Sequence, residues 1–450
     1  MRILLRLLSY LLLLPLLLWL VLVNVRLYHQ PAYQLVEGQS LHSGIQAQLA
    51  WLSQVLPAYA PADPAAQLEA YTLYGLAACD LLAVTPSDSY LYTEALAHVD
   101  SALAWTAALS GAFESPQALP QGAQYHGWTS YLLGRKLEAL PTSARTPADM
   151  QRLREACDQT VALWRKLGHP YPARTAGEAY AMDGLLCAAA VALHERLAPG
   201  RYAPTLATWL TQVRTRLDTD SLLPYQVAVA DGQPLVAAQG HSLSPMLVWL
   251  ADLAPQFAQT QFMRYRQQLG WSYLGIRAIR AQAPAQADPP AAGAAPVWGQ
   301  VSLPASLRGL RTLARYQADE DALIVRNLTE ALAMGWHWQG EKRYWLASSP
   351  NTQAWIVWAY GCEANAAQRL LNRSQWRWPL HLLSLGIMLL LGLLLLLLHR
   401  ATRPPSNLDG NDTSAPSASH NKAQSRARPR TLSTQRSSPD PPQWELPPQA

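Results

Sequence analysis

The first residues of this chain that could do chemistry are Tyr125-His126-Gly127-Trp128, which follow the turn Pro120-Gln121-Gly122 and precede an apolar helical segment. An imidazole at the entrance of a helix can act as an acid, a base or a hydrogen-bond donor. We therefore take His126 as a candidate catalytic residue and Tyr125 and Trp128 as candidate ligand contacts. The alternative is that the imidazole only closes the turn by bonding backbone groups.

A second group of candidates lies in Glu178-Ala179-Tyr180-Ala181-Met182-Asp183. On a helix Tyr180 and Asp183 share a face, whereas Glu178 and Asp183 do not. The strongly apolar segment that follows implies that an inward Asp183 needs a partner, such as Arg174 or His126. We expect Asp183 to be the second catalytic residue and Tyr180 and Glu178 to contact a ligand. Alternatively, Glu178 merely complements a helix dipole.

Gly240-His241-Ser242-Leu243-Ser244-Pro245 has the pattern of a helix start with Ser242 as the capping residue. Free backbone N–H groups at such a start bind polar or anionic ligand groups, and His241 is a candidate contact. The alternative is a capped helix with a surface histidine. The chain has no G-x-S-x-G motif, so the sequence gives no support to a serine hydrolase.

Tryptophan is unusually frequent, with 17 residues against three phenylalanines. Tryptophan rings stack on sugar faces and line amphipathic pockets, so we expect a pocket for a saccharide or an isoprenoid that includes Trp298. The competing explanation is that these rings fill seams between helices near a membrane. Tryptophans crowd the last third of the chain and the residues just before it, among them Trp298, Trp336, Trp338, Trp345, Trp355 and Trp358.

Motif analysis points to no cofactor, no metal and no nucleic-acid partner. There is no P-loop, dinucleotide fingerprint or haem motif, and no basic stripe with interleaved aromatic residues. The four cysteines lack zinc-ligand spacing and lie in apolar helical contexts: Cys79, Cys157, Cys187 and Cys362. Buried free thiols are the favoured interpretation, with disulfides as the alternative.

Apolar residues recur at helical spacing in about twelve segments of the central region, separated by turn signals. The segments expected to be helical include Pro64–Val84, Gly122–Ala139, Gly177–Leu197 and Pro255–Ile279. The only strand-like segment is Tyr225–Ala230, with Asp231-Gly232 as a possible hairpin turn. The predicted fold class is therefore all-α. Consecutive antiparallel pairs in this number are typical of an α/α toroid, in which inner helices surround a central pocket. We expect this pocket to be lined by Tyr74, His126, Asp183, His241 and several tryptophans.

Two leucine-rich segments, Ile3–Val25 and Pro379–Leu398, bracket the chain, and each is long enough to cross a bilayer of about 30 Å. Basic residues flank both outer ends, at Arg2 and Arg6 and again at Arg400 and Arg403. By the positive-inside rule both termini are cytoplasmic, and the body between them is extracytoplasmic. A cleaved signal peptide is the alternative for the first segment, but no small-x-small cleavage site follows it.

The predicted organisation is a membrane anchor at 1–27, a toroid domain at 35–374, a second membrane helix at 377–400 and a disordered cytoplasmic tail at 401–450. The tail is rich in Pro, Ser, Arg and Gln and has almost no large apolar residue. The Pro/Ala-rich stretch 281–296 is expected to form a flexible loop within the domain.

Several blocks of the chain resemble a bacterial, often membrane-anchored α/α-toroid family related to linalool dehydratase/isomerase. They are Leu73-Tyr74-Gly75-Leu76-Ala77, Tyr125-His126-Gly127-Trp128, Tyr180-Ala181-Met182-Asp183 and Gly240-His241-Ser242-Leu243-Ser244. The resemblance covers most of residues 44 to 330 and implies a toroid in a bacterial inner membrane, with Tyr74 among the ligand contacts.

The chain departs from this family where relatives carry acids. The turn before the first inner helix has Asp63 but no glutamate, and Gln300–Pro304 contains no acid. Two hypotheses follow. In the first, the protein is a ligand-binding or scaffold component of the cell envelope, with a protein, small-molecule or glycan partner. In the second, it is a lyase, isomerase or glycan-processing enzyme that uses His126 and Asp183 on an isoprenoid or a saccharide.

Overall fold

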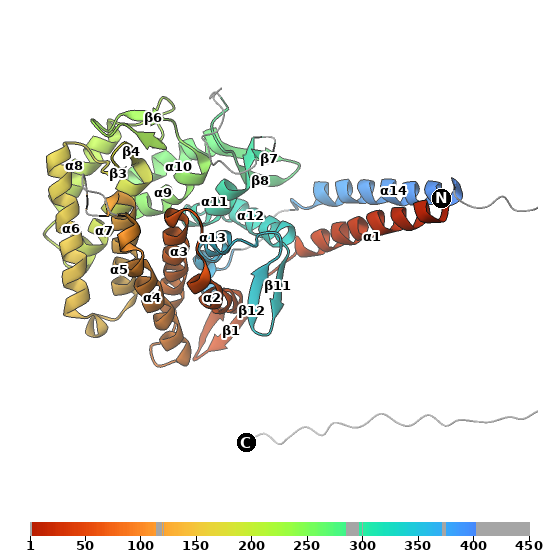
Figure 1. Ribbon diagram of the computed structural model, residues 1–450, viewed down its shortest axis with the longest axis horizontal. Coiled ribbons are helices and arrows are strands. Elements are labelled where there is room, and N and C mark those ends of the chain that lie inside the picture. The colour runs from red at the N-terminus through yellow and green to blue at the C-terminus, as the bar shows by residue number, and fades with distance from the viewer. Residues whose placement is uncertain are drawn as a thin grey trace, which may run out of the picture. The chain divides into compact units, whose positions relative to one another are not determined.

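The computed structural model describes residues 2–113, 119, 121–284, 297–298, 300–370 and 375–401. This part of the chain is mostly helical, as the sequence predicts, with fourteen α-helices and five small sheets. Figure 1 shows the helical body and the two helices, α1 and α14, that extend from it. The predicted tail, most of the predicted loop 281–296 and the side chain of Trp298 lie outside the described residues.

Six helices pack against one another in succession: α3 contacts α5, α5 contacts α7, and so on until α13 returns to α3. Their residues are largely apolar or small on every side, which is typical of helices surrounded by others. In α3 and α7 almost every residue beyond the first turn is buried. The bounds are α3 Pro64–Leu82, α5 Gly122–Ala139, α7 Ala181–Leu197, α9 Gly240–Leu253, α11 Leu303–Arg315 and α13 Pro350–Tyr360.

The alternate helices cover this group from outside, and each packs on one or two of the six. They are more polar; α6, for example, buries only five side chains along one face. Several begin at a capping side chain, such as Ser89 before α4 and Thr146 before α6. The bounds are α2 Ser43–Val55, α4 Tyr90–Ala108, α6 Pro147–Leu167, α8 Ala203–Arg214, α10 Pro255–Leu269 and α12 Asp319–Leu332.

Short antiparallel strands connect the helices. A four-stranded sheet in the order β3-β4-β5-β6 lies at the upper edge of Figure 1. Its strands are β3 Ala173–Thr175, β4 Glu178–Tyr180, β5 Gln226–Val227 and β6 Pro234–Val236. The two-stranded sheets pair β1 Tyr33–Val36 with β2 Gln39–His42, β7 Gly270–Tyr273 with β8 Ile276–Ile279, β9 Val297–Trp298 with β10 Val301–Ser302, and β11 Gly335–Trp338 with β12 Glu341–Tyr344.

Some expected helices are wrong in part because short strands occupy residues that were expected to be helical. The segment expected as helix from Gly177 begins only at Ala181, since Glu178–Tyr180 pairs with its neighbours as β4. The segment Pro255–Ile279 ends as a helix at Leu269, and β7 and β8 follow. Leu274 and Gly275 take left-handed backbone angles, with φ of 48° and 80°, and form the turn between these strands.

Helices α1 (Arg2–Arg26) and α14 (Trp378–Ala401) run antiparallel and contact each other. The Tyr10 Oη of α1 lies 2.9 Å from His399 Nδ1 of α14. Tyr28, two residues after α1, has its Oη 2.7 Å from His381 Nε2 of α14. Among the described residues one helix, Trp378–Arg400, is long and apolar enough to cross a membrane, and almost none of it is buried. Tyr10–Arg26 is a shorter apolar segment.

Candidate functional site

A cavity of about 310 Å³ lies where the first turns of several inner helices meet the four-stranded sheet. Gln124 is in the first turn of α5, Met182 in that of α7 and His241 in that of α9. Partial positive charge at helix N-termini favours polar acceptor groups in such a place. The polar side chains in its lining are Asp63, Glu69, Gln124, Arg174, Tyr180, Tyr225, Gln239, His241, Ser242 and Arg308.

Asp183 is fully buried behind this cavity and reaches it through Arg174. The two side chains form a two-pronged ion pair, with Nε to Oδ2 at 2.8 Å and Nη2 to Oδ1 at 3.1 Å. Of the two expected partners of Asp183, Arg174 is therefore the one it contacts. Gly122 allows the approach of this segment: its φ is +74°, and a Cβ there would lie 2.3 Å from the Arg174 carbonyl oxygen. The carboxylate neutralises and orients a guanidinium that faces the cavity.

Three aromatic rings follow one another along the lining. The Arg174 guanidinium lies 4.1 Å from the centre of the Tyr180 ring, Tyr180 is 5.3 Å from Tyr225, and Tyr225 is 5.3 Å from His241. Both ring contacts are edge-to-face. Burial raises the pKa of Tyr225 and of Tyr180. The rings therefore present uncharged faces and hydroxyl groups to a ligand.

Arg308 and Glu69 form the opposite part of the lining. Arg308 lies 3.9 Å above the Trp355 ring, donates to the His241 carbonyl oxygen at 3.1 Å and lies 3.6 Å from Glu69. Glu69 accepts hydrogen bonds from Trp355 Nε1 at 3.0 Å and from Asn351 at 3.2 Å. Burial lowers the pKa of Arg308. The cavity thus presents cationic hydrogen-bond donors, the arginines, and anionic acceptors, the carboxylates.

Glu69, Arg308 and Trp355 lie on α3, α11 and α13, and the same three helices carry a second set of acid, arginine and tryptophan about one turn further along α11. Arg311 lies 4.8 Å from the Trp358 ring and donates to Asp80 at 2.9 Å. Arg311 and Asp80 line a second cavity of about 570 Å³, which Arg135 also lines. Arg311 and Arg135 both pair with the buried Asp80 carboxylate, which is a sufficient structural reason for them. Arg308 and Arg311 are therefore a matched pair in separate cavities.

The two residues proposed from the sequence as catalytic do not line one cavity. His126 is buried on α5, and its Nε2 lies 2.9 Å from the Ala156 carbonyl oxygen of α6. With Tyr125 it lines a third cavity of about 260 Å³ between α4, α5 and α6. Burial lowers the pKa of His126, which favours a neutral imidazole. Asp183 instead serves the first cavity through Arg174.

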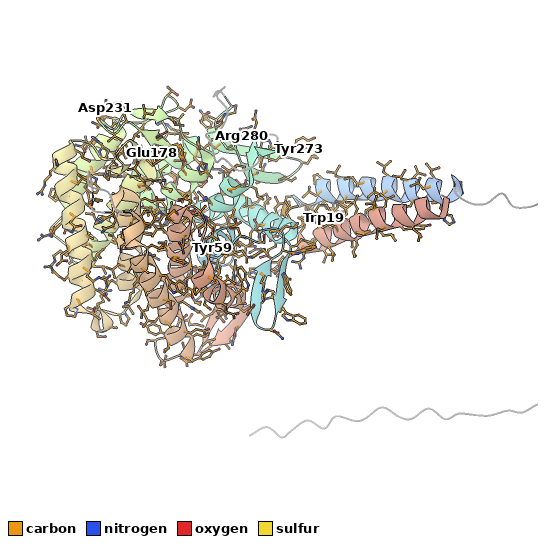
Figure 2. All side chains as sticks on the ribbon, in the orientation of Figure 1. Trp19, Tyr59, Glu178, Asp231, Tyr273 and Arg280 are labelled. Carbon is orange, nitrogen blue, oxygen red and sulfur yellow. The ribbon has the colours of Figure 1, made fainter. Side chains whose placement is uncertain are left out.

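The other sequence candidates divide between cavity, core and surface. Tyr180 and His241 line the first cavity. Tyr74 and Trp128 are fully buried; the Tyr74 hydroxyl lies 2.5 Å from His98 Nδ1, and Trp128 packs edge-to-face on Trp249. Glu178 is exposed on β4, at the upper edge of the body in Figure 2. Nothing is described of the Trp298 side chain.

Sequence reasoning missed Glu69, Arg308 and Tyr225. A signal for Glu69 was present, because it and Asp80 are the two charged residues of the otherwise apolar helix α3. A buried carboxylate requires a cationic partner, and Arg308 and Arg311 supply one each. The pairing itself depends on which helices become neighbours, which spacing along the chain does not reveal.

The described residues contain no group of three or more His, Cys, Asp or Glu side chains placed to hold a metal ion. All four cysteines are free thiols; Cys79, Cys157 and Cys187 are buried and Cys362 is partly buried. This agrees with the favoured interpretation of the sequence. Burial raises the pKa of each thiol, so none is poised as a nucleophile.

Histidine burial predicts how stability depends on pH. Burial lowers the pKa of His241, His29 and His98 to about 4 and that of His42 to about 3, from an ordinary value of 6.5. Below pH 6.5 these histidines bind protons in the unfolded chain but stay neutral in the folded chain. The free energy of unfolding should therefore fall as the pH is lowered from 6.5 toward 4. Denaturant titrations at several pH values measure this slope, and His241→Gln should reduce it. A stability that is constant or rises toward pH 4 would exclude the buried neutral histidines.

The chain matches none of the protein-family models and has no significant similarity to any curated protein sequence.

Proposed function

We propose that this chain is an α/α-toroid protein held in a membrane by two helices and that its first cavity binds a saccharide-like ligand. The toroid is supported by the succession of contacts among the six inner helices, which returns from α13 to α3. The kinship with linalool dehydratase-like toroids, suggested by the sequence blocks, belongs to this proposal. The lengths and antiparallel packing of α1 and α14 support two membrane spans.

In this proposal the body is extracytoplasmic in a bacterial inner membrane and both termini are cytoplasmic. Basic residues stand at the ends of α1 and α14 that point away from the body, with Arg2 on one helix and Arg400 on the other. Protease added to spheroplasts should cut within residues 30–375, whereas inside-out vesicles should protect this region. The reverse pattern would contradict the orientation.

The ligand class follows from the lining of the first cavity. Both cations are already balanced, Arg174 by Asp183 and Arg308 by Glu69. The remaining surface offers hydroxyl, amide and aromatic groups, which match the hydroxyl groups and apolar faces of a sugar. Its volume of about 310 Å³ lies at the lower end of ligand pockets, suited to one or two sugar rings. An isoprenoid chain would leave many of these polar groups unpaired.

The observation that carries this proposal is the convergence of balanced charges and three aromatic rings on one cavity at helix N-termini. The full-length chain in detergent should show a higher melting temperature with maltose, cellobiose or N,N′-diacetylchitobiose. Geraniol, the isoprenoid control, should have no such effect. Stabilisation by geraniol alone would contradict the saccharide proposal. A binding or scaffold role in the cell envelope requires no turnover of the bound sugar.

An enzyme that acts on the same ligand is the second candidate. In this second candidate function, Glu69 is the carboxylate of the lining proposed to act on the ligand, since its side chain is only 13% exposed and faces Arg308. His241 and Tyr225 provide further proton-bearing groups at the same cavity. Product formation from a bound disaccharide, lost in Glu69→Gln with binding retained, would favour the enzyme. Unchanged disaccharide would favour the binding module.

A further inference from the structure

The hairpin β11–β12 turns tryptophan side chains toward solvent and a lysine toward the protein interior, the opposite of the usual arrangement. Its register pairs Trp336 with Arg343 and Trp338 with Glu341, and these side chains point outward together with Trp345. Trp336, Trp338 and Trp345 are 39%, 58% and 72% exposed. Among the described residues these are the body's most exposed tryptophans apart from those on α1 and α14. A three-tryptophan surface of this kind marks an interaction site.

The inward face of the same hairpin holds charge. Lys342 is 1% exposed and donates to Glu330 of α12 at 2.6 Å, and the Tyr344 hydroxyl donates to the same carboxylate at 2.6 Å. Breaking a buried pair of this kind leaves an uncompensated charge in the protein interior and is strongly destabilising. The hairpin therefore cannot turn over to bury its tryptophans, and their exposure is a fixed feature of the fold.

This surface adjoins the place where α1 and α14 join the body. Arg26, the last residue of α1, donates to the carbonyl oxygen of Gly335 at the start of β11, and α12 packs on α1. The β7–β8 turn packs closely against the segment that leads into α14. A Cβ at Gly275, whose φ is +80°, would lie 2.3 Å from the carbonyl oxygen of Trp376, two residues before α14. Figure 1 shows both hairpins on the side of the body from which α1 and α14 extend.

The β7–β8 hairpin is also apolar at its tip. Tyr273 is 62% exposed and Leu274 is 41% exposed. Figure 2 places Tyr273 on the same side of the body as the base of the helix that carries Trp19. Arginines accompany both hairpins, with Arg343 beside Trp336 and Arg277 on β8. Tryptophan, tyrosine and arginine are the residues that membrane–water interfaces favour.

We propose that the two hairpins dock onto the lipid bilayer and hold the body flat against the membrane surface. The proposal rests on the membrane anchoring proposed above. The bilayer is the partner because the β7–β8 turn lies against Trp376, two residues before the helix that is long and apolar enough to cross a membrane. The β11–β12 hairpin is bonded to Arg26 at the end of the neighbouring helix α1. Arg343 and Arg277 are already paired with Glu341 and Asp321, so the docking is attributed to the exposed rings. Docking would fix the orientation of the body relative to the membrane.

Tryptophan quenching tests this proposal on the full-length chain in nanodiscs of phosphatidylcholine and phosphatidylglycerol. Some of the lipids carry bromine on the acyl chain close to the headgroup. The triple variant W336F/W338F/W345F should lose at least about half of the emission that these lipids quench, because it removes three of about five tryptophans expected at the bilayer. Trp105→Phe, on the remote helix α4, should leave the quenched emission unchanged.

The variant W19F/W378F separates this proposal from the anchoring on which it depends. Quenching that falls in W19F/W378F but not in the triple variant would overturn the docking and leave the anchoring intact. Absence of lipid quenching in the unaltered chain would overturn both. If the triple variant misfolds, Trp345→Phe alone, at a side chain that is 72% exposed, should still give a smaller loss of quenching.

Discussion

Replacing Glu363 with alanine is expected to lower the free energy of unfolding by about 3–5 kcal/mol, because it leaves the buried charge of Arg326 unpaired. The Glu363 carboxylate accepts two hydrogen bonds from Arg326, at 2.7 and 2.8 Å, and one from the Leu370 backbone N–H at 2.9 Å. Arg326 and Glu363 are 3% and 0% exposed. Neither group can recover these bonds from water.

Denaturant titration of the full-length chain in detergent, followed by near-UV circular dichroism, measures this loss. Asp252→Ala is the matched control, because it removes the partner of Arg315 from an ion pair whose arginine is 50% exposed. Such pairs contribute about 0–1 kcal/mol. Equal losses in the two variants would contradict the buried pair at Glu363.

Replacing Asp183 with alanine is expected to be comparably severe, about 3–5 kcal/mol, and to weaken binding of the cavity ligand as well. The alanine removes both hydrogen bonds that hold Arg174 against the cavity. Asp183→Asn keeps one acceptor and should cost less, about 1–3 kcal/mol. Asp183 acts here as a positioning residue, so a loss of ligand affinity in the still folded Asp183→Asn variant is the result that distinguishes this role.

Titration of each variant with the disaccharide that most stabilises the unaltered chain gives the affinity, and denaturant titration gives the stability. Asp158→Ala is the control, since its ion pair with Arg201 is on the surface, with side chains 42% and 52% exposed. It should change neither quantity by more than about 1 kcal/mol. An Asp183→Asn variant that binds with full affinity would limit Asp183 to a structural role.

The sequence predicts the helices well where capping residues or proline mark their starts. Helix α3 begins at Pro64 as expected, with Asp63 as the cap that accepts from the Ala65 N–H. Gly122–Ala139 also has its expected bounds, although it begins without a side-chain cap. The expected strand at Tyr225–Ala230 is present in part, as β5, which pairs with β6 beyond Asp231-Gly232. The other strands were missed because each has only two to four residues, which is too short for an alternating pattern. Whether a span such as 270–279 pairs as strands depends on the helices it packs against.

The candidate site was predictable only as a set of local motifs. Tyr180 and His241 line the cavity because they lie at or just before the starts of inner helices, which their turn signals mark. His126 also lies near a helix start, but its ring points toward Ala156 of the neighbouring helix. The direction of a side chain around its helix depends on tertiary contacts. The pairing of Arg308 with Glu69 joins residues 239 positions apart and has no local signature.

Disaccharide affinity in variants of the two matched arginines of α11 tests most directly the claim that the first cavity binds a saccharide. Arg308 and Arg311 each stack on a tryptophan of α13 and pair with an acid of α3, but they line different cavities. Titration with the stabilising disaccharide should show that Arg308→Gln lowers affinity at least about tenfold, or about 1.4 kcal/mol, while Arg311→Gln leaves it unchanged. Equal affinity in the two variants, or weakening by Arg311→Gln alone, would contradict a saccharide site at the N-terminal ends of the inner helices.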